Sequence, residues 1–241
     1  MHEISLKAEP LFSLLGLTIT NTIFSSVLVV GTLLTVLSLN ASRFKLVPSG
    51  TFQIGFELIY TVIGNLYTGI MHKEHKGSVL FSLLFCIFIY ILMANWFGLL
   101  PVVSSVMLHT AQGEVPVFRA PTSDLSVTAS LAVISVVLTN ALGVSFGGLK
   151  YLTKYFNFKT PIDLVVGLLE LISELGKLLS FSFRLFGNVF AGEVLLAVIT
   201  SLTYGVFTLP FFGLELFVGL IQALVFFLLT TVFISVAVTH E

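Results

Sequence analysis

Charge is what this sequence has least of. Only 11 Lys and Arg and 12 Asp and Glu occur among 241 residues, so 10% of the chain is charged, whereas soluble domains carry about 25%. The hydrophobic share is 56% and the mean hydropathy is +1.08. This composition excludes a soluble globular domain and predicts a polytopic membrane protein. The formal net charge of −1 provides no basic field, which argues against nucleic acid as a partner.

Motifs for metals and cofactors are also missing. The only cysteine, Cys86, stands in an apolar run, and the five histidines are scattered near ends and loops. The sequence therefore has no cluster with metal-ligand spacing. It has no phosphate loop, no internal repeat and no inverted symmetry, so we predict neither a metal nor a cofactor. The N-terminus lacks a cleavable signal pattern, and we expect the first apolar run to remain as a span.

Uncharged runs long enough to cross a bilayer recur along the chain. Residues 21–40 carry no charge, and at about 1.5 Å per residue they cross a hydrocarbon core of about 30 Å. Further spans are predicted for residues 78–100 and 124–147. Asp124 is placed at the N-terminal cap of the latter, where a carboxylate suits the helix dipole. Two segments are predicted to lie outside the membrane, the N-terminal tail 1–20 and the outer loop 101–123.

Residues 51–76 have a different pattern. Polar side chains recur there at spacings of three and four on an otherwise apolar helix, namely Gln53, Glu57, Thr61, Asn65, Thr68 and His72. This narrow stripe, followed at once by the charged run 73–76, predicts an amphipathic helix that lies on the inner surface of the membrane. The alternative is an ordinary span with one buried glutamate.

The last third of the chain predicts two long helices. The pattern over 161–203 is helical without a strong breaker, and about 40 residues would measure roughly 60 Å, twice a bilayer core. This helix must therefore be strongly tilted, curved or broken. Tyr204-Gly205 marks a turn, and 207–238 forms a second tilted helix. The predicted fold is one all-α membrane domain, with about five spanning helices, one interfacial helix and a long tilted hairpin at its end.

Basic residues predict the orientation. If the N-terminus is outside and 51–76 lies on the inner surface, the basic residues of the inner side are Arg43, Lys45, Lys73, Lys76, Lys150, Lys154 and Lys159. The outer side then holds only Lys7 and Arg119. This positive-inside bias predicts an outer N-terminus and a cytoplasmic C-terminus. A sixth span over 51–76 would instead place the first two of these residues opposite the later lysines.

Ionisable residues gather in the first of the two long helices. Glu170, Glu174, Lys177, Arg184 and Asn188 fall within about 80° of one another around one helix. Glu174 and Lys177, three residues apart, are able to neutralise one another. An arginine at the centre of a span costs about 2.5–3.5 kcal/mol on insertion scales, so an intramembrane cluster of this kind predicts an ion or proton pathway.

Arg184 differs from the other members of this seam. It has no partner three or four residues away along the chain, because the polar neighbour at that spacing is the uncharged Asn188. We therefore expect an anion from another helix or another subunit. The alternative is a packing arginine that snorkels, but the site lies far from a helix end.

Two further glutamates flank the turn of the hairpin. In an antiparallel pair of helices, Arg184 is predicted to lie level with Gln222, and Glu193 with Glu215. Two adjacent carboxylates in a low dielectric cannot both ionise cheaply, so the pair is expected to share a proton and to suit a relay. Glu170 lies about 21 Å from Arg184 in the other direction, toward the inner surface. Polar groups on both sides of a fixed positive charge predict two half-pathways separated by that charge.

Short motifs in this hairpin carry a family resemblance. They are Phe183-Arg184-Leu185-Phe186-Gly187-Asn188, Ala191-Gly192-Glu193, Gly213-Leu214-Glu215 and Ile221-Gln222-Ala223. Weaker matches are Asn95-Trp96-Phe97-Gly98-Leu99-Leu100-Pro101 and Pro121-Thr122-Ser123-Asp124. With these motifs the sequence closely resembles subunit a of the F-type ATP synthase. The resemblance covers residue 95 to the C-terminus, and the predicted topology agrees over the rest.

The resemblance implies a proton-translocating subunit in the stator of a rotary motor. Arg184 matches the essential arginine, which faces the carboxylate of the c-subunit ring, promotes its deprotonation and blocks a short circuit of protons. Glu193 and Glu215 match the two polar positions of the outer half-channel. Asn188 and Gln222 match polar neighbours of the arginine. Many relatives carry histidine at one of the two outer positions, whereas this sequence has glutamate at both.

The resemblance also implies the surroundings of the chain. Glu170 matches the glutamate of the inner half-channel. The implied partners are the c-subunit ring, the peripheral-stalk b subunits, the remaining F1Fo subunits and the lipid bilayer. The Ala191-Gly192-Glu193 pattern is of the bacterial and plastid type, which implies a bacterial plasma (inner) membrane. Because the chain has no nucleotide site, we expect it to be non-catalytic by itself.

Two other classes of function are weaker alternatives. A proton-coupled secondary transporter would use the polar seam to bind a substrate, but the sequence has no repeat pair and no interrupted helices in matching halves. A purely structural assembly subunit would not explain why Arg184 and the paired glutamates lie inside the membrane. Copurification with a soluble ATPase and a small hairpin subunit would separate the resemblance from both.

Overall fold

Helices make up most of the computed structural model. It describes residues 9–14, 17–42, 44–45, 48, 50–71, 77–100, 103, 106–110, 113–148, 150–153, 155, 161–205 and 207–239. Within these residues, five helices are long and apolar enough to cross a membrane. They are α1 (Asn21–Ala41), α3 (Ser78–Gly98), α4 (Leu125–Gly147), α6 (Pro161–Thr203) and α7 (Thr208–Thr239). The predicted class, an all-α polytopic membrane protein, is confirmed.

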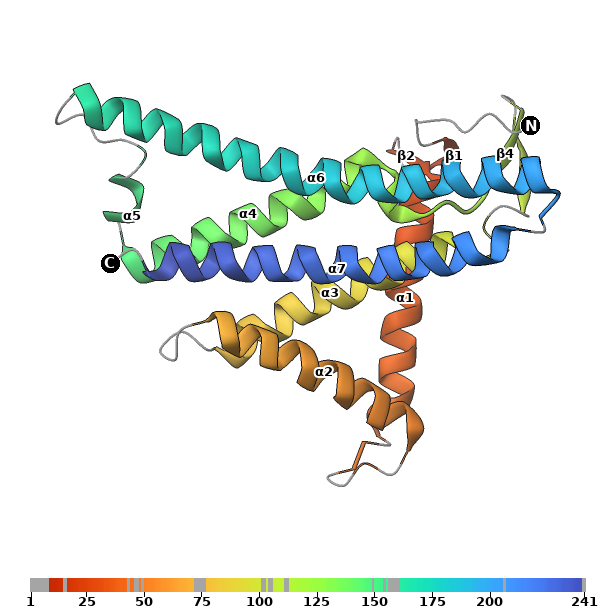
Figure 1. Ribbon diagram of the computed structural model, residues 1–241, viewed down its shortest axis with the longest axis horizontal. Helices are drawn as coiled ribbons and strands as arrows, with labels where there is room; N and C mark the ends of the chain where they lie inside the picture. Colours follow the sequence, from red (N-terminus) through yellow and green to blue (C-terminus); the bar gives the residue numbers. More distant parts are fainter. Residues whose placement is uncertain are drawn as a thin grey trace.

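The long hairpin sets the shape of the molecule. Helix α6 runs unbroken over 43 residues, and it lies beside α7 along the longest axis, whereas α1 stands steeply across both (Figure 1). A bilayer crossed by α1 along its axis would therefore contain α6 and α7 as strongly tilted helices. The connection between them is the predicted turn: Tyr204 and Gly205 have positive φ angles of 50° and 85°. The Gly205 amide donates to the carbonyl of Thr200 over 3.1 Å, which ends α6 with a left-handed cap.

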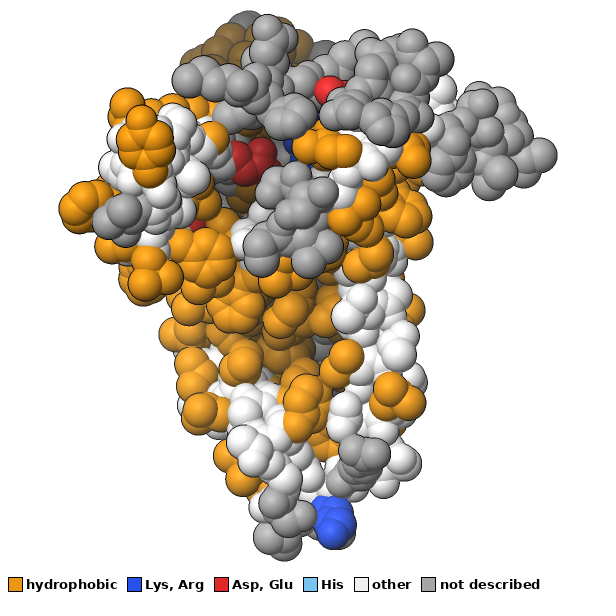
Figure 2. All heavy atoms as spheres, turned by 90° about the vertical axis from the view of Figure 1, so that its right-hand side faces the viewer, with side chains coloured by type: hydrophobic (Ala, Val, Ile, Leu, Met, Phe, Trp, Pro, Cys, Tyr) orange, Lys and Arg blue, Asp and Glu red, His pale blue; other side chains and the backbone are white. Residues whose placement is uncertain are grey.

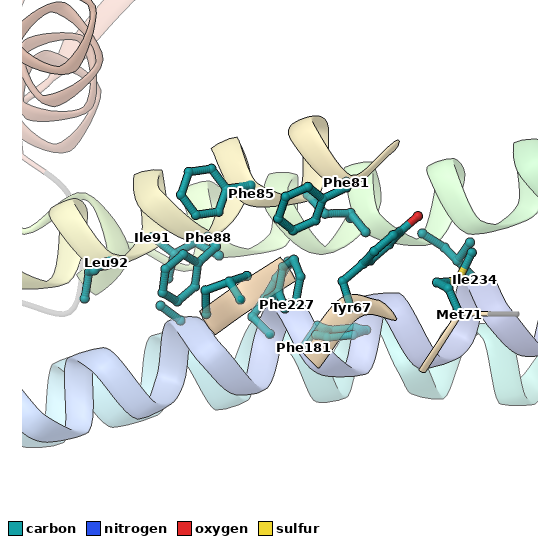
Figure 3. Close-up of a cluster of buried hydrophobic side chains, with 14 of the residues drawn as sticks. Tyr67, Met71, Phe81, Phe85, Phe88, Ile91, Leu92, Phe181, Phe227 and Ile234 are labelled. Carbon is teal, nitrogen blue, oxygen red and sulfur yellow. The ribbon is translucent and has the colours of Figure 1, made fainter. Parts of the chain in front are cut away.

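Helix α7 forms the centre of the packing. It contacts α3, α4 and α6, and its inward face carries Phe226, Phe227 and Ile234, all almost fully buried. Figure 3 shows Phe88 of α3 and Phe181 of α6 near Phe227 in this core. The ring centroids lie 6.2 Å apart for Phe88 and Phe227, and 4.8 Å apart for Phe181 and Phe226. Edge and tilted contacts of this kind stabilise the aromatic core beyond the area they bury.

Helix α2 (Thr51–Ile70) packs beneath this core. Its buried face carries Ile63 and Tyr67, and Tyr67 points toward the phenylalanines of α3 (Figure 3). Of the predicted polar stripe, Gln53 is buried and donates to the Lys45 carbonyl and to Glu57, both over 2.6 Å. The stripe positions 61, 65 and 68 are exposed. The position of α2 at a membrane surface stays a prediction.

Two short hairpins replace parts of the predicted tail and outer loop. Strand β1 (Pro10–Leu14) pairs with β2 (Leu17–Thr20), and β3 (Met107–Thr110) pairs with β4 (Gly113–Pro116), both antiparallel. The alternation of leucine and isoleucine with threonine in β2 is typical of a strand, but isolated two-stranded hairpins are marginal and were not predicted. Two short helical turns complete the chain, the 3₁₀ turn η2 (Pro121–Ser123) and α5 (Lys150–Thr153).

The start of α4 has a side-chain cap. Asp124 caps α4 as predicted, because its Oδ1 accepts a hydrogen bond from the Ser126 amide over 2.8 Å. Several residues used to predict the orientation and the interfacial segment lie outside the described residues, namely Lys7, Arg43, His72, Lys73, Lys76, Lys154 and Lys159.

Candidate functional site

A cavity lies between α6, α7, the end of α3 and Ala120, the residue before the η2 turn. Its empty volume, which includes space open to solvent, is about 370 Å³. Its polar lining consists of Asn95, Asn188, Glu193, Glu215 and Gln222. The hairpin thus brings together four of the residues that the sequence singled out, and both glutamates lie at one cavity as the antiparallel register predicted.

Contacts across the hairpin fix the register. The Asn188 amide Nδ2 donates to Oε1 of the buried Gln222 over 2.6 Å. The sequence had placed Arg184 level with Gln222, but Asn188, one helical turn further along α6, makes this contact. Toward the turn, the Glu215 carboxylate packs directly on the backbone of Gly192, where a Cβ atom would collide with it. Gly192 is therefore the residue that makes room for Glu215.

A second set of polar groups lies beside Glu193. Ala120, which lies between Arg119 and the η2 turn, lines the cavity together with Glu193. The Arg119 Nε atom in turn donates to Ser123 Oγ over 2.9 Å. The sequence analysis treated Arg119 as a loop residue, since nothing in its neighbourhood along the chain pointed to a glutamate more than 70 positions away.

Arg184 does not line this cavity. Its side chain is exposed, and its Nη2 atom donates to Ser180 Oγ over 3.1 Å. The expectation of no partner at this spacing was wrong, because the sequence analysis overlooked the hydroxyl four residues earlier. Among the described residues, no acidic side chain pairs with Arg184. Beside this polar strip, α6 also exposes apolar side chains, with Leu179 and Phe183 more than half exposed.

The other end of α6 carries a closed polar network. Lys177 Nζ and Glu174 Oε1 lie 2.6 Å apart, which confirms the predicted pair. Glu174 also accepts hydrogen bonds from Asn140 Nδ2 over 3.2 Å and from the Tyr155 hydroxyl over 3.1 Å. Glu170, one turn closer to the start of α6, is half-buried. The network ties α6 to α4 and gives both charges of the pair a partner.

Comparison with known proteins decides the family. The model of the family described as ATP synthase A chain matches residues 22–235. The chain belongs to this family. ATP synthase subunit a of Syntrophobacter fumaroxidans is 32% identical over 207 residues, which cover 84% of this chain and 78% of the relative. The same subunit of Solibacter usitatus is 32% identical over 92% of this chain and 88% of the relative. The subunit of Gloeobacter violaceus is 34% identical over 81% and 74%.

Membership in the ATP synthase A chain family makes the chain one subunit of a larger F1Fo assembly and a multi-pass membrane protein. Within the structure, Asn95 is a bridging residue. Asn95 Nδ2 donates to the Gly219 carbonyl over 3.1 Å, and its Oδ1 accepts from the Thr122 hydroxyl over 2.8 Å. Beside it, Trp96 Nε1 donates to the Leu216 carbonyl over 3.0 Å. Asn95 thus joins α3, α7 and the η2 turn at one wall of the cavity.

Replacing Asn95 by alanine is expected to destabilise the subunit by about 1–3 kcal/mol, because the buried Gly219 carbonyl and Thr122 hydroxyl each lose a partner. The melting temperature of the detergent-solubilised complex, followed by release of the subunit, measures this loss. Cys86→Ala is the matched control, since Cys86 lies on the same helix and is exposed. An unchanged melting temperature for Asn95→Ala would contradict the prediction.

Proposed function

We propose that the chain is the proton-translocating stator subunit a of an F-type ATP synthase. In this proposal, two aqueous half-channels deliver protons to the c-ring carboxylates and remove them, and Arg184 separates the two. The observation that supports it is the division of polar groups on the hairpin. Four of them meet in one cavity, whereas Arg184 stands apart from it, exposed on α6.

The cavity provides the outer half-channel. Protons from the outer side would enter at Glu193 and Glu215, which accept and release them in turn, and water in the cavity would connect the two carboxylates. The hydrogen-bonded pair Asn188 and Gln222 lies at the end of the cavity nearer to Arg184. On the opposite side of Arg184, Glu170 would belong to the inner half-channel.

The exposed face of α6 provides the surface for the rotor. An arginine on an apolar face inside a membrane is costly unless an anion meets it. A c-ring carboxylate about 4 Å from Arg184 would gain roughly 4 kcal/mol at an effective dielectric of 20, which favours release of its proton. The exposed apolar side chains of α6, such as Leu179 and Phe183, suit a helical ring that slides past. The c-subunit ring and the peripheral-stalk b subunits are therefore the proposed partners, in a bacterial plasma membrane with the N-terminus outside.

Replacing Glu193 or Glu215 by glutamine tests the outer half-channel. Each change removes a proton-binding group while it keeps the shape, so we expect passive proton conductance to fall at least about tenfold, the effect of ~1.4 kcal/mol on a barrier. The measurement uses membrane vesicles that carry the complex without its soluble sector, under an imposed pH gradient. Glu57→Gln is the matched control, because Glu57 lies on α2 and glutamine can still accept the bond from Gln53. Wild-type conductance in both cavity variants would refute the route through the cavity.

A further inference from the structure

The segment 116–124 is anchored to the first turns of α1. Asn21 Nδ2 donates to the Pro116 carbonyl over 3.3 Å, and Thr22 Oγ1 donates to Asp124 Oδ2 over 2.8 Å. Ser25 Oγ accepts the backbone amide of Arg119 over 3.1 Å. These three side chains of α1 are at most 1% exposed. Three hydrogen bonds thus fix the position of the segment relative to α1.

The anchored segment carries a positive charge to the outer end of the cavity. Arg119 Nε donates to Ser123 Oγ over 2.9 Å, and Ser123 is fully buried and donates to the Ala120 carbonyl over 2.9 Å. The η2 turn that contains Ser123 packs on α6, and Ala120, the residue after Arg119, lines the cavity together with Glu193. In Figure 2, acidic side chains with a basic one beside them are recessed at this end of an otherwise apolar surface.

We propose that Arg119 is the positioning residue of the outer pathway: its guanidinium, aligned by Ser123 and by the contacts to α1, holds the Glu193 carboxylate at the outer end of the cavity. This inference rests on the proposed function and adds a residue to it. It assigns to α1 a role in the pathway, although α1 contributes no side chain to the cavity lining.

Electrostatics gives the reason for a cation at this place. Glu215 faces the same cavity from α7, and a second carboxylate in a low dielectric disfavours the charged form of Glu193. Asp124 is occupied by its bonds to Thr22 and to the start of α4. Arg119 is the charge on the other side that offsets the repulsion, so Glu193 can give up its proton to the interior of the cavity and regain one from the outer side. A neutral side chain could fill the same space but could not offset the repulsion between the two carboxylates.

Charge-changing variants of Arg119 test this role. We expect Arg119→Gln to lower passive proton conductance about tenfold, the change given by one ~1.4 kcal/mol interaction, and Arg119→Lys to keep most of it. The measurement uses the assembled complex in vesicles without the soluble sector, with copurification of the other subunits as the check on assembly. Lys45→Gln is the matched control, since Lys45 lies beyond the opposite end of α1 and its bonds to Gln53 come from the backbone.

Chemical rescue distinguishes the charge of Arg119 from its shape. If the residue had a purely structural role, conductance would not depend on the charge of the added group. Cys86 is the only cysteine, so Arg119→Cys in a Cys86→Ala background presents one new thiol. Treatment from the outer side with an aminoethyl thiosulfonate restores a positive charge, and conductance is expected to recover. The sulfonatoethyl reagent adds similar bulk with a negative charge and is expected to leave conductance low.

The outcomes separate this inference from the proposed function. Low conductance in Arg119→Gln with recovery by lysine or by the aminoethyl group supports the positioning role. Low conductance in Glu193→Gln together with normal conductance in Arg119→Gln overturns the role of Arg119 and leaves the proposed pathway intact. Equal loss in Arg119→Gln and Arg119→Lys, with no difference between the two reagents, overturns it as well, because shape rather than charge then matters. Normal conductance in Glu193→Gln overturns the route through the cavity and with it the inference.

Discussion

Arg184→Ala is expected to abolish ATP-driven proton pumping and to raise the passive proton leak. The reason lies in the position of Arg184, exposed on α6 outside the cavity and without an acidic partner among the described residues. A rotor carboxylate that loses an interaction of roughly 4 kcal/mol would release its proton about 1,000-fold less readily. Removal of the same charge would also open a direct path between the two half-channels. Acidification of inverted vesicles by ATP, followed by leak down an imposed gradient, measures both effects.

Two variants show which property of Arg184 matters. Arg184→Lys keeps the charge but not the planar fork, so we expect it to block the leak better than it supports pumping. Ser180→Ala removes the hydroxyl that accepts from Nη2 over 3.1 Å and is expected to weaken pumping only slightly. Normal pumping by Arg184→Ala would refute the proposed separation of the half-channels and would favour the secondary transporter.

The long helices could be predicted because each follows from a local property of the chain. Uncharged runs of 20 or more residues must form helices in a bilayer, since backbone groups have no other partners there. The turn at Tyr204 and Gly205 could be predicted for a similar reason, because glycine accepts the positive φ angle that ends a helix. The strands β1 to β4 could not, because an isolated two-stranded hairpin is marginal and a segment of four or five residues is too short for a clear pattern.

Only the residues of the site that lie on the α6–α7 hairpin could be predicted from the sequence. Glu193 and Glu215 were placed together because an antiparallel pair of helices with a known turn has a known register. The register gives the depth of a residue but not the direction of its side chain, and so Gln222 bonds to Asn188 while Arg184 lies on the exposed side of α6. Arg119 lies in a distant segment, which is held at the cavity by contacts to α1 such as the bond from its backbone amide to Ser25. Such tertiary placement has no signature along the chain.

Gly192→Ala is expected to lower proton conductance about tenfold, by the ~1.4 kcal/mol that displacement of one carboxylate would add to the barrier. The added methyl group would occupy the space of the Glu215 carboxylate, which lies at the end of a flexible side chain and would swing away. Alanine also favours a helix over glycine by about 1 kcal/mol, so the complex is expected to assemble normally. Conductance and the yield of assembled complex, measured on the same vesicles, separate the two effects.

Two further substitutions, Glu215→Asp and Gly213→Ala, make the test of Gly192→Ala more specific. Gly192→Ala combined with Glu215→Asp removes one methylene from the displaced side chain, so the carboxylate regains room and conductance is expected to recover in part. Gly213→Ala is the matched control, because nothing lies within 4 Å of a Cβ atom added there, and it is expected to conduct like the wild type. Full conductance in Gly192→Ala alone would mean that protons do not need the Glu215 carboxylate at this position. The outer route would then have to run through Glu193 and water, with Glu215 serving only to keep the cavity polar.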